Sequence, residues 1–199
     1  MWSGREEHRE RDSQRNSANC PLWCDTDFTP DGADSLRMDE LVTRISHVGD
    51  NLTLCVLTGG EPLLQADGSL VRALQDEGFR VAVETNGTVR IREAFDDGNG
   101  RVVPPDWIVC SPKLPQDQLR IEYCHELKLI VPDYRPSQYD EFVNAVRTVR
   151  LAGEERTLLW LQPEEGQRYD QARKLAAELV LKDPRWSVSL QTHKYLGVQ

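Results

Sequence analysis

The sequence predicts an α/β fold in which parallel strands alternate with crossover helices. Two observations carry this prediction. The expected strands are short, nearly continuous apolar runs, as in sheets that are covered on both faces. The segments between them place apolar residues at helical spacing, which is typical of crossover helices. With 199 residues, 39% of them hydrophobic and 29% charged, the chain is long enough to bury a substantial core. We therefore expect a single domain over residues 1–199.

The expected elements follow one another in a regular order. The strands are Leu52–Leu57, Phe79–Val83, Trp107–Cys110, Leu127–Val131, Thr157–Leu161 and Trp186–Leu190. The helices are Ser69–Glu77, Tyr139–Val149 and Tyr169–Leu181, preceded by Met38, Leu41, Val42 and Ile45 at helical spacing. Residues 3–19 are almost all polar, which fits a solvated loop or a short exposed helix. Residues 97–106 have the turn composition of a loop and do not mark a domain boundary.

The overall charge excludes one class of partner. The net charge is −9 at pH 7 and the isoelectric point is about 5.0. A nucleic-acid-binding surface needs an excess of Lys and Arg to neutralise phosphates, so we expect no nucleic-acid partner. No apolar run is long enough to cross a bilayer, and the chain opens with mixed charges. We expect a cytoplasmic protein with no membrane partner.

Two cysteines near the start of the chain, Cys20 and Cys24, stand just before an aspartate and Thr26. Thiols this close together in a soluble chain are better placed to hold an iron–sulfur cluster or another metal than to pack a core. A third thiol is not nearby. Cys55 and Cys110 lie in apolar runs, and the total of five cysteines is odd. Free or metal-bound thiols in a reducing compartment therefore fit better than a disulfide framework.

Polar residues follow the end of most expected strands. The segments are Thr58–Pro62, Glu84–Gly87, Ser111–Lys113, Gln162–Gly166 and Gln191–Tyr195. Each segment alone has a structural explanation, such as a tight turn, a helix cap or a surface histidine. In a parallel sheet or barrel, however, all these turns share the carboxyl-terminal edge, where ligands bind. Taken together they predict a small-molecule site at that edge.

Several of these segments resemble one family in consistent order along the whole chain. They are Cys24–Phe28, Thr58–Pro62, Glu84–Gly87, Ser111–Lys113, Glu126–Lys128, Gln162–Pro163 and Gln191–Leu196. The chain resembles 7-carboxy-7-deazaguanine synthase, a radical S-adenosylmethionine enzyme of queuosine and 7-deazapurine biosynthesis. The Gly-Gly-Glu-Pro turn alone suggests only the radical superfamily. The terminal Gln-Thr-His-Lys-Tyr-Leu and the Cys-Asp-Thr are much more particular to this family.

The resemblance implies a reaction, its cofactors and its partners. The family converts 6-carboxy-5,6,7,8-tetrahydropterin to 7-carboxy-7-deazaguanine and releases ammonia, a ring contraction that needs a cofactor to supply a radical. The implied cofactors are a [4Fe-4S] cluster, S-adenosylmethionine and Mg²⁺. The implied partners are the pterin substrate, a reductant such as flavodoxin or ferredoxin, and a second copy of the chain in a homodimer.

Carried over by position, the resemblance also implies residue roles. Cys20 and Cys24 would be cluster ligands, and the hydroxyl of Thr26 would bind Mg²⁺. Thr58 and the terminal Gln199 would contact the substrate. The cofactor site would be formed by Gly60, Ser111, Pro112, Lys113, Gln162, Pro163, Glu164 and Glu165, with Glu84 as a further contact.

The chain departs from the family pattern in two places. The first cluster cysteine and the opening strand of the family would lie before Met1. The expected architecture is therefore a partial, shortened TIM-like barrel of the radical S-adenosylmethionine type. Cys20 and Cys24 also enclose three residues where the family commonly has two.

Other readings are open at this point. The chain could be another radical S-adenosylmethionine enzyme, such as a glycyl-radical activase. It could be a truncated or degenerate, non-catalytic copy that binds a pterin or a nucleoside. It could also be a nucleotide-binding α/β protein in which Cys20 and Cys24 form a redox pair. The presence of a cluster after anaerobic reconstitution separates the radical enzymes from the last two readings. The activase would not be expected to end in the segment Gln191–Leu196.

Overall fold

The computed structural model describes residues 6–16, 22, 33–48, 52–146, 149–151, 154–192 and 196–197. The described strands are β1 (Leu54–Leu57), β2 (Arg80–Thr85), β3 (Trp107–Cys110), β4 (Glu126–Val131), β5 (Val149–Leu151), β6 (Glu154–Arg156), β7 (Leu158–Pro163) and β8 (Trp186–Val188). The described α-helices are α1 (Arg9–Asn16), α3 (Met38–His47), α4 (Gly68–Asp76), α5 (Ile91–Ala94), α6 (Asp140–Ala145) and α7 (Tyr169–Lys182). Short 3₁₀ turns are η1 (Glu6–His8), η2 (Pro62–Leu64), η3 (Gln116–Gln118) and η4 (Pro136–Gln138).

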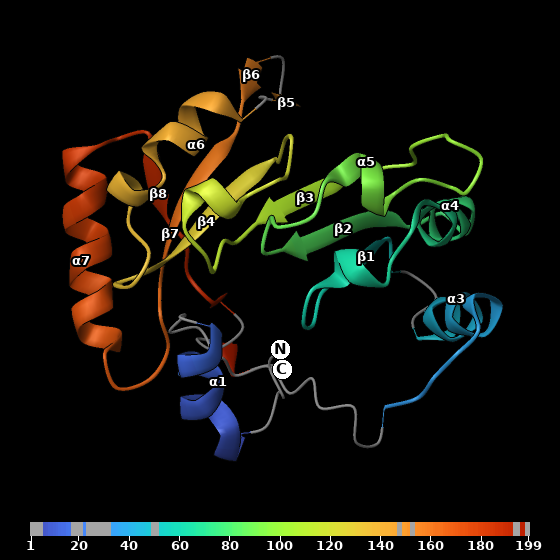
Figure 1. The fold of residues 1–199 in the computed structure, drawn as a ribbon, viewed down its shortest axis with the longest axis horizontal. Helices are drawn as coiled ribbons and strands as arrows, with labels where there is room; N and C mark the ends of the chain where they lie inside the picture. The colour runs from blue at the N-terminus through green and yellow to red at the C-terminus, as the bar shows by residue number, and fades with distance from the viewer. Residues whose placement is uncertain are drawn as a thin grey trace.

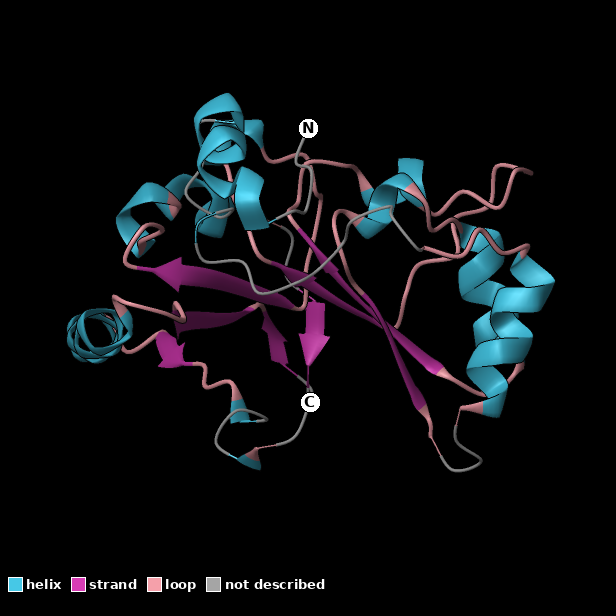
Figure 2. Cartoon of the chain, turned by 90° about the horizontal axis from the view of Figure 1, so that it is seen from below, coloured by secondary structure: helices cyan, strands magenta, loops and turns pink. Residues whose placement is uncertain are grey.

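Within the described residues, the main sheet has six strands in the order β1-β2-β3-β4-β7-β8. Every neighbouring pair in it is parallel. The strands therefore follow chain order, with one crossover after another, and β7 lies steeply across the direction of β2 and β3 (Figure 1). The strands form a central layer with helices around it (Figure 2). The predicted α/β class, with parallel strands and crossover helices, is confirmed.

One face of this sheet carries the core, and we call it the packed face. Side chains alternate between the two faces of a strand, and those of Val81, Val83, Ile108, Leu127, Leu129 and Leu161 are almost completely buried in one cluster. Helix α4 contributes Val71 and Leu74 to this cluster, and α7 contributes Ala172 and Ala176. Alanine lets the backbone of α7 approach the strands closely.

The other face, which we call the opposite face, carries the alternate residues of the same strands. Neighbours there are Glu84 and Val109, Val109 and Glu126, Lys128 and Trp160, and Ile130 and Gln162. This face is richer in polar groups than the packed face. Strand β1 adds Leu54 and Val56, whose exposed fractions are 56% and 48%.

Several boundary predictions are wrong, and two of them affect the site. The strand predicted to end at Val83 continues to Thr85, which makes Glu84 a strand residue. The helix predicted over 139–149 ends at Ala145, because Val146 is extended (φ −62°, ψ 133°) and Val149–Leu151 pairs with Glu154–Arg156 in an antiparallel hairpin. The strand predicted to end at Leu161 continues to Pro163. Gln162 and Pro163 are therefore strand residues, and the sheet fixes the directions of their side chains.

The segment at the start of the chain forms an element that the sequence left open. Residues 6–16 are helical, as η1 and α1, and Asp12 is only 2% exposed. Residues 97–106 form a loop as predicted. Its start is built by aspartate side chains that accept backbone hydrogen bonds: Asp96 Oδ1 from Gly98 at 2.7 Å, and Asp97 Oδ1 from Asn99 at 3.0 Å.

Candidate active site

The carboxyl ends of the parallel strands meet along one edge of the sheet, as the sequence analysis expected. Thr58 and Gly60 follow β1, Ser111–Lys113 follows β3, and Glu164–Glu165 follows β7. Strands β2, β3 and β4 lie between β1 and β7 in the sheet. The predicted contacts thus occupy the same edge but form two groups, one beside β1 and one at β3 to β7.

The turn after β1 is open, and a half-buried carboxylate, that of Glu61, anchors it. Thr58, Gly59 and Gly60 are exposed, and Gly59 has φ 117° with no atom within 4 Å of the position of a Cβ. A side chain there would be strained, so the turn keeps its backbone accessible. The next residue, Glu61, accepts hydrogen bonds from Thr85 Oγ1 at 2.7 Å and from the backbone N–H groups of Asn86 and Leu63 at 2.7 and 3.1 Å. Its carboxylate ties the turn after β1 to the end of β2.

The Ser-Pro-Lys segment after β3 is held from two sides. Lys113 Nζ donates to the carbonyl and the hydroxyl of Ser111 at 2.8 and 2.7 Å. The phenol of Tyr134 donates to the carbonyl of Lys113 at 3.1 Å, and that of Tyr139 donates to the carbonyl of Leu114 at 2.8 Å. Burial raises the pKa of the Tyr139 phenol, so it remains a donor at neutral pH. The loop is therefore fixed before any ligand arrives.

A pocket of about 530 Å³ opens beside this segment. Its lining consists of Lys113, Leu114, Pro115, Gln116, Asp117, Asp133, Tyr134, Gln138, Tyr139 and Glu141. The lining joins the loops that follow β3 and β4, so the pocket belongs to the carboxyl edge. Lys113 is the predicted site residue that reaches it.

The opposite face carries an ion pair between two strands that are not neighbours. Lys128 Nζ of β4 lies 3.1 Å from Glu84 Oε1 of β2, across β3. The lysine side chain is 17% exposed and the glutamate side chain 42%. Glu84, expected from the resemblance to be a cofactor contact, thus has a cation beside it within the sheet.

At the end of β7, the last strand residues are followed by a carboxylate, that of Glu164, which an arginine binds. Gln162 is half-buried, and Pro163 and Glu164 are buried, whereas Glu165 is exposed. Glu164 is only 3% exposed. Both its oxygens accept from Arg168, at 2.6 Å from Nε and 2.5 Å from Nη2. Its own N–H donates to Val131 O at 3.0 Å, which fastens the loop after β7 to the end of β4.

The described cysteines are core thiols. Cys110 and Cys124 are completely buried, and Cys55 is half-buried. Burial raises the pKa of all three thiols, that of Cys124 to about 12, so they stay protonated at neutral pH. Within the described part of the chain, no group of three or more His, Cys, Asp or Glu side chains could hold a metal ion. The predicted ligands Cys20, Cys24 and Thr26 lie outside the described residues, as does Gln199.

Sequence reasoning did not single out three charged residues that organise this edge. Glu61 was read only as part of a glycine turn, and Arg168 and Asp133 were not assigned a role. Glu164 and Arg168 both lie before α7, so the helical spacing rule does not apply to them and no local pattern indicates their contact. The contact between Arg168 and Asp133 joins segments 35 residues apart, and no local pattern indicates it.

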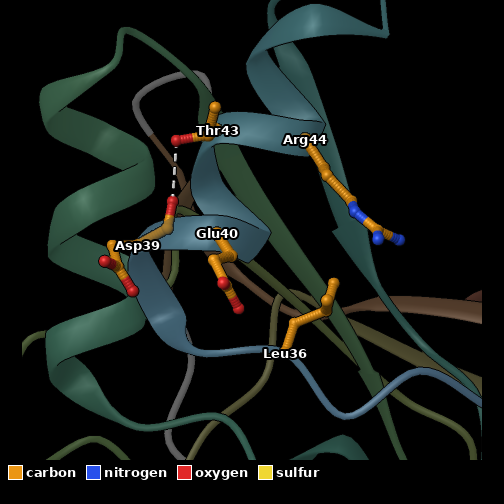
Figure 3. Close-up of a pocket in the computed structure, with 5 residues that line it drawn as sticks. All are labelled: Leu36, Asp39, Glu40, Thr43 and Arg44. Atoms are coloured by element: carbon orange, nitrogen blue, oxygen red, sulfur yellow. Dashed lines mark hydrogen bonds between the residues drawn. The ribbon is translucent and has the colours of Figure 1, made fainter.

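A second hollow, of about 390 Å³, lies on helix α3. Figure 3 shows its lining of Leu36, Asp39, Glu40, Thr43 and Arg44. The Thr43 hydroxyl donates back to the Asp39 carbonyl at 2.8 Å, which is a bond within the helix. This hollow belongs to one helix surface and contains none of the predicted site residues.

None of the helices that the structure describes is both long and apolar enough to cross a membrane.

Comparison with known proteins identifies the family. No protein-family model matches the chain. The 7-carboxy-7-deazaguanine synthase of Bradyrhizobium diazoefficiens is 35% identical over 206 residues, which cover 100% of this chain and 85% of that protein. The synthase of Bordetella pertussis is 36% identical over 211 residues, covering 100% of this chain and 84% of the relative. The crystal structure of QueE from Escherichia coli superimposes with a TM-score of 0.60 at 24% identity, over 85% of this chain and 78% of that one, and so supports the fold. The chain belongs to the 7-carboxy-7-deazaguanine synthase family.

Proposed function

We propose that this chain catalyses the reaction of its family, the conversion of 6-carboxy-5,6,7,8-tetrahydropterin to 7-carboxy-7-deazaguanine with release of ammonia. The reaction is a carbon–nitrogen lyase step in 7-deazapurine and queuosine biosynthesis. The observation that supports it most is that the predicted contacts among the described residues lie along one edge of a parallel sheet, where ligands bind in such folds. When bound, a [4Fe-4S] cluster and S-adenosylmethionine supply the radical chemistry that side chains lack.

The described residues suit the binding of a zwitterionic cofactor and a pterin. The open backbone at Gly60 leaves amide and carbonyl groups free to approach the methionine part of S-adenosylmethionine. The segments Ser111–Lys113 and Gln162–Glu165 would line the rest of the cofactor site, with Pro112 and Pro163 as apolar walls. Thr58, exposed at the end of β1, would offer its hydroxyl to the substrate.

Three predicted metal ligands and one predicted substrate contact complete the proposal. Cys20 and Cys24 would bind the cluster, Thr26 would bind Mg²⁺ beside the substrate carboxylate, and Gln199 would close over the pterin. Support for these four roles comes from the resemblance of the motifs around them and from family membership. The described thiols would not compete for the cluster, because Cys110 and Cys124 are buried, Cys55 is half-buried, and burial raises the pKa of all three.

The assembly is part of the same proposal. Residues 1–199 would form one domain, and two copies would form a cytoplasmic homodimer. A small electron carrier such as flavodoxin or ferredoxin would deliver the electron that starts the reaction. The acidic net charge of −9 leaves little for nucleic acid to bind.

The test is anaerobic reconstitution of the purified chain with iron and sulfide, followed by incubation with the pterin, S-adenosylmethionine, Mg²⁺ and dithionite. We expect iron and sulfide to be incorporated, and 7-carboxy-7-deazaguanine to appear by mass spectrometry. Thr58→Val is expected to raise KM for the pterin. Thr53→Val, at the other end of the same strand segment, is the matched control and is expected to leave KM unchanged.

Two results would count against the proposal. If neither residues 1–199 nor a chain extended upstream of Met1 incorporates iron and forms product, the protein would instead fit a non-catalytic binding protein. A chain that cleaves S-adenosylmethionine but leaves the pterin intact would fit another member of the radical superfamily. The iron analysis and the product analysis separate these two results.

A further inference from the structure

Three charged side chains from three segments meet at the carboxyl edge, between the ends of β4 and β7. Asp133 follows β4, Glu164 follows β7, and Arg168 stands immediately before α7. Arg168 Nη1 and Nη2 donate to the two oxygens of Asp133 at 3.1 and 2.8 Å. Its Nε and Nη2 donate to the two oxygens of Glu164. One guanidinium thus holds both carboxylates, and we call this arrangement the Arg168 clamp.

Burial makes the clamp more than a surface ion pair. The side chains of Glu164 and Asp133 are 3% and 11% exposed, whereas that of Arg168 is 42% exposed. The hydrogen bonds to Asp133 and then to Glu164 raise the pKa of Arg168. A buried carboxylate is strongly disfavoured without its cation, so loss of Arg168 would drive Glu164 to move or to take up a proton. The planar fork of arginine suits two carboxylates in a way that a lysine ammonium does not.

The clamp is attached directly to residues of the proposed cofactor site. Gln162 and Pro163 immediately precede Glu164, and the Glu164 N–H binds the carbonyl of Val131. Because Arg168 occupies both oxygens of Glu164, that carboxylate is engaged within the protein. Glu164 would therefore serve the site through its backbone and through the path that the clamp imposes on the chain after β7.

We propose that Arg168 is a positioning residue, which holds the end of β7 in the shape that receives the methionine-containing cofactor. This inference rests on the proposed function, and it gives a role to a residue that does not itself touch the ligand. Loss of Arg168 should therefore weaken cofactor binding and should have little effect on the rate of the chemical step once the cofactor is bound.

The experiment compares Arg168→Ala and Arg168→Lys with the unsubstituted, cluster-reconstituted protein. The matched control is Arg185→Ala, which removes an exposed arginine that also binds one aspartate, Asp183, with two nitrogens. Calorimetric titration with S-adenosylmethionine gives Kd, and hydrogen exchange reports on the peptide spanning residues 161–169. We expect Arg168→Ala to raise Kd and to speed exchange in that peptide about tenfold each.

A merely structural role would give a different pattern. For Arg168→Ala, we expect KM for S-adenosylmethionine to rise while kcat falls less than twofold. Arg168→Lys should give a KM between those of Arg168→Ala and the unsubstituted protein, and Arg185→Ala should leave KM unchanged. If Arg168→Ala does not fold, Asp133→Asn opens only one arm of the clamp and is expected to raise Kd about threefold. An unchanged Kd in folded Arg168→Ala or Asp133→Asn would overturn the positioning role alone. Failure of the unsubstituted protein to bind S-adenosylmethionine would overturn the proposed function and this inference with it.

Discussion

The two faces of the sheet are built by the same strands and differ in almost every respect. On the packed face, Val83 and Leu129 are completely buried among aliphatic neighbours. On the opposite face, the adjacent residues Glu84 and Lys128 form an ion pair between β2 and β4. Because side chains alternate along a strand, one set of side chains packs in the core and stabilises the fold, while the other set is available to contact ligands. The two sets should respond to mutation in different ways.

The largest effect on stability is expected on the packed face. Leu129→Ala removes a side chain of 0% exposure and should lower the free energy of unfolding by about 3 kcal/mol. Val56→Ala is the control, because Val56 is 48% exposed and should cost less than about 1 kcal/mol. Urea unfolding followed by circular dichroism measures both. Equal losses in the two variants would remove the distinction between the faces.

A smaller effect is expected where the end of β2 touches the packed face. Gly87 has φ 81°, and a Cβ on it would lie 2.7 Å from Cys110 Sγ. Gly87→Ala should therefore cost about 2 kcal/mol, from backbone strain together with the displaced thiol. Gly98→Ala is the matched control, since Gly98 has the same φ of 81° with nothing within 4 Å. The difference between the two losses in free energy of unfolding measures the cost of displacing the Cys110 thiol. Similar losses in the two variants would show that backbone strain accounts for the whole cost.

The opposite face should respond in activity and hardly in stability. Lys128→Met should change the free energy of unfolding by less than about 1 kcal/mol, because the Glu84 side chain of the pair is 42% exposed. The same change should lower turnover about tenfold or more, because Glu84 loses the cation that orients it. Arg92→Met is the control, because it breaks a second ion pair, 2.9 Å from Glu122, that involves neither Glu84 nor Lys128. Turnover that falls equally in both variants would contradict a special role for the opposite face.

The smallest effect concerns the amino end of the sheet and depends on pH. His125 stacks on Trp107 at 4.7 Å, and its Nδ1 accepts the Ile108 N–H at 3.0 Å. Burial lowers the pKa of His125, although Asp106 opposes the shift. The unfolded chain then binds the proton more readily, so stability should fall as pH drops through about 6.5. His125→Gln should flatten this part of the profile. Chemical unfolding at a series of pH values between 5 and 8 measures the slope.

The six strands of the main sheet were predictable because each is an apolar run long enough to cross a buried layer, whereas the short strands β5 and β6 were not. The boundaries failed where a local pattern served two structures: Val146 and Val149 fit a helical face, yet β-branched residues also favour the short hairpin that forms. The edge on which the described, predicted site residues lie also followed from the sequence, since parallel strands leave only one place for their carboxyl ends. The Arg168 clamp did not follow, because Asp133 and Arg168 meet only after β4 and β7 have paired.

One of the two tyrosines that contact the loop after β3, Tyr139, makes that loop observable by ultraviolet spectroscopy. Tyr139 is 1% exposed, its phenol donates to Leu114, and burial raises its pKa. In an alkaline titration its phenolate absorbance should therefore appear later than that of a tyrosine in water. Any change that loosens the loop would bring this absorbance to lower pH. The native chain thus carries its own optical indicator, next to Lys113, which requires no added dye.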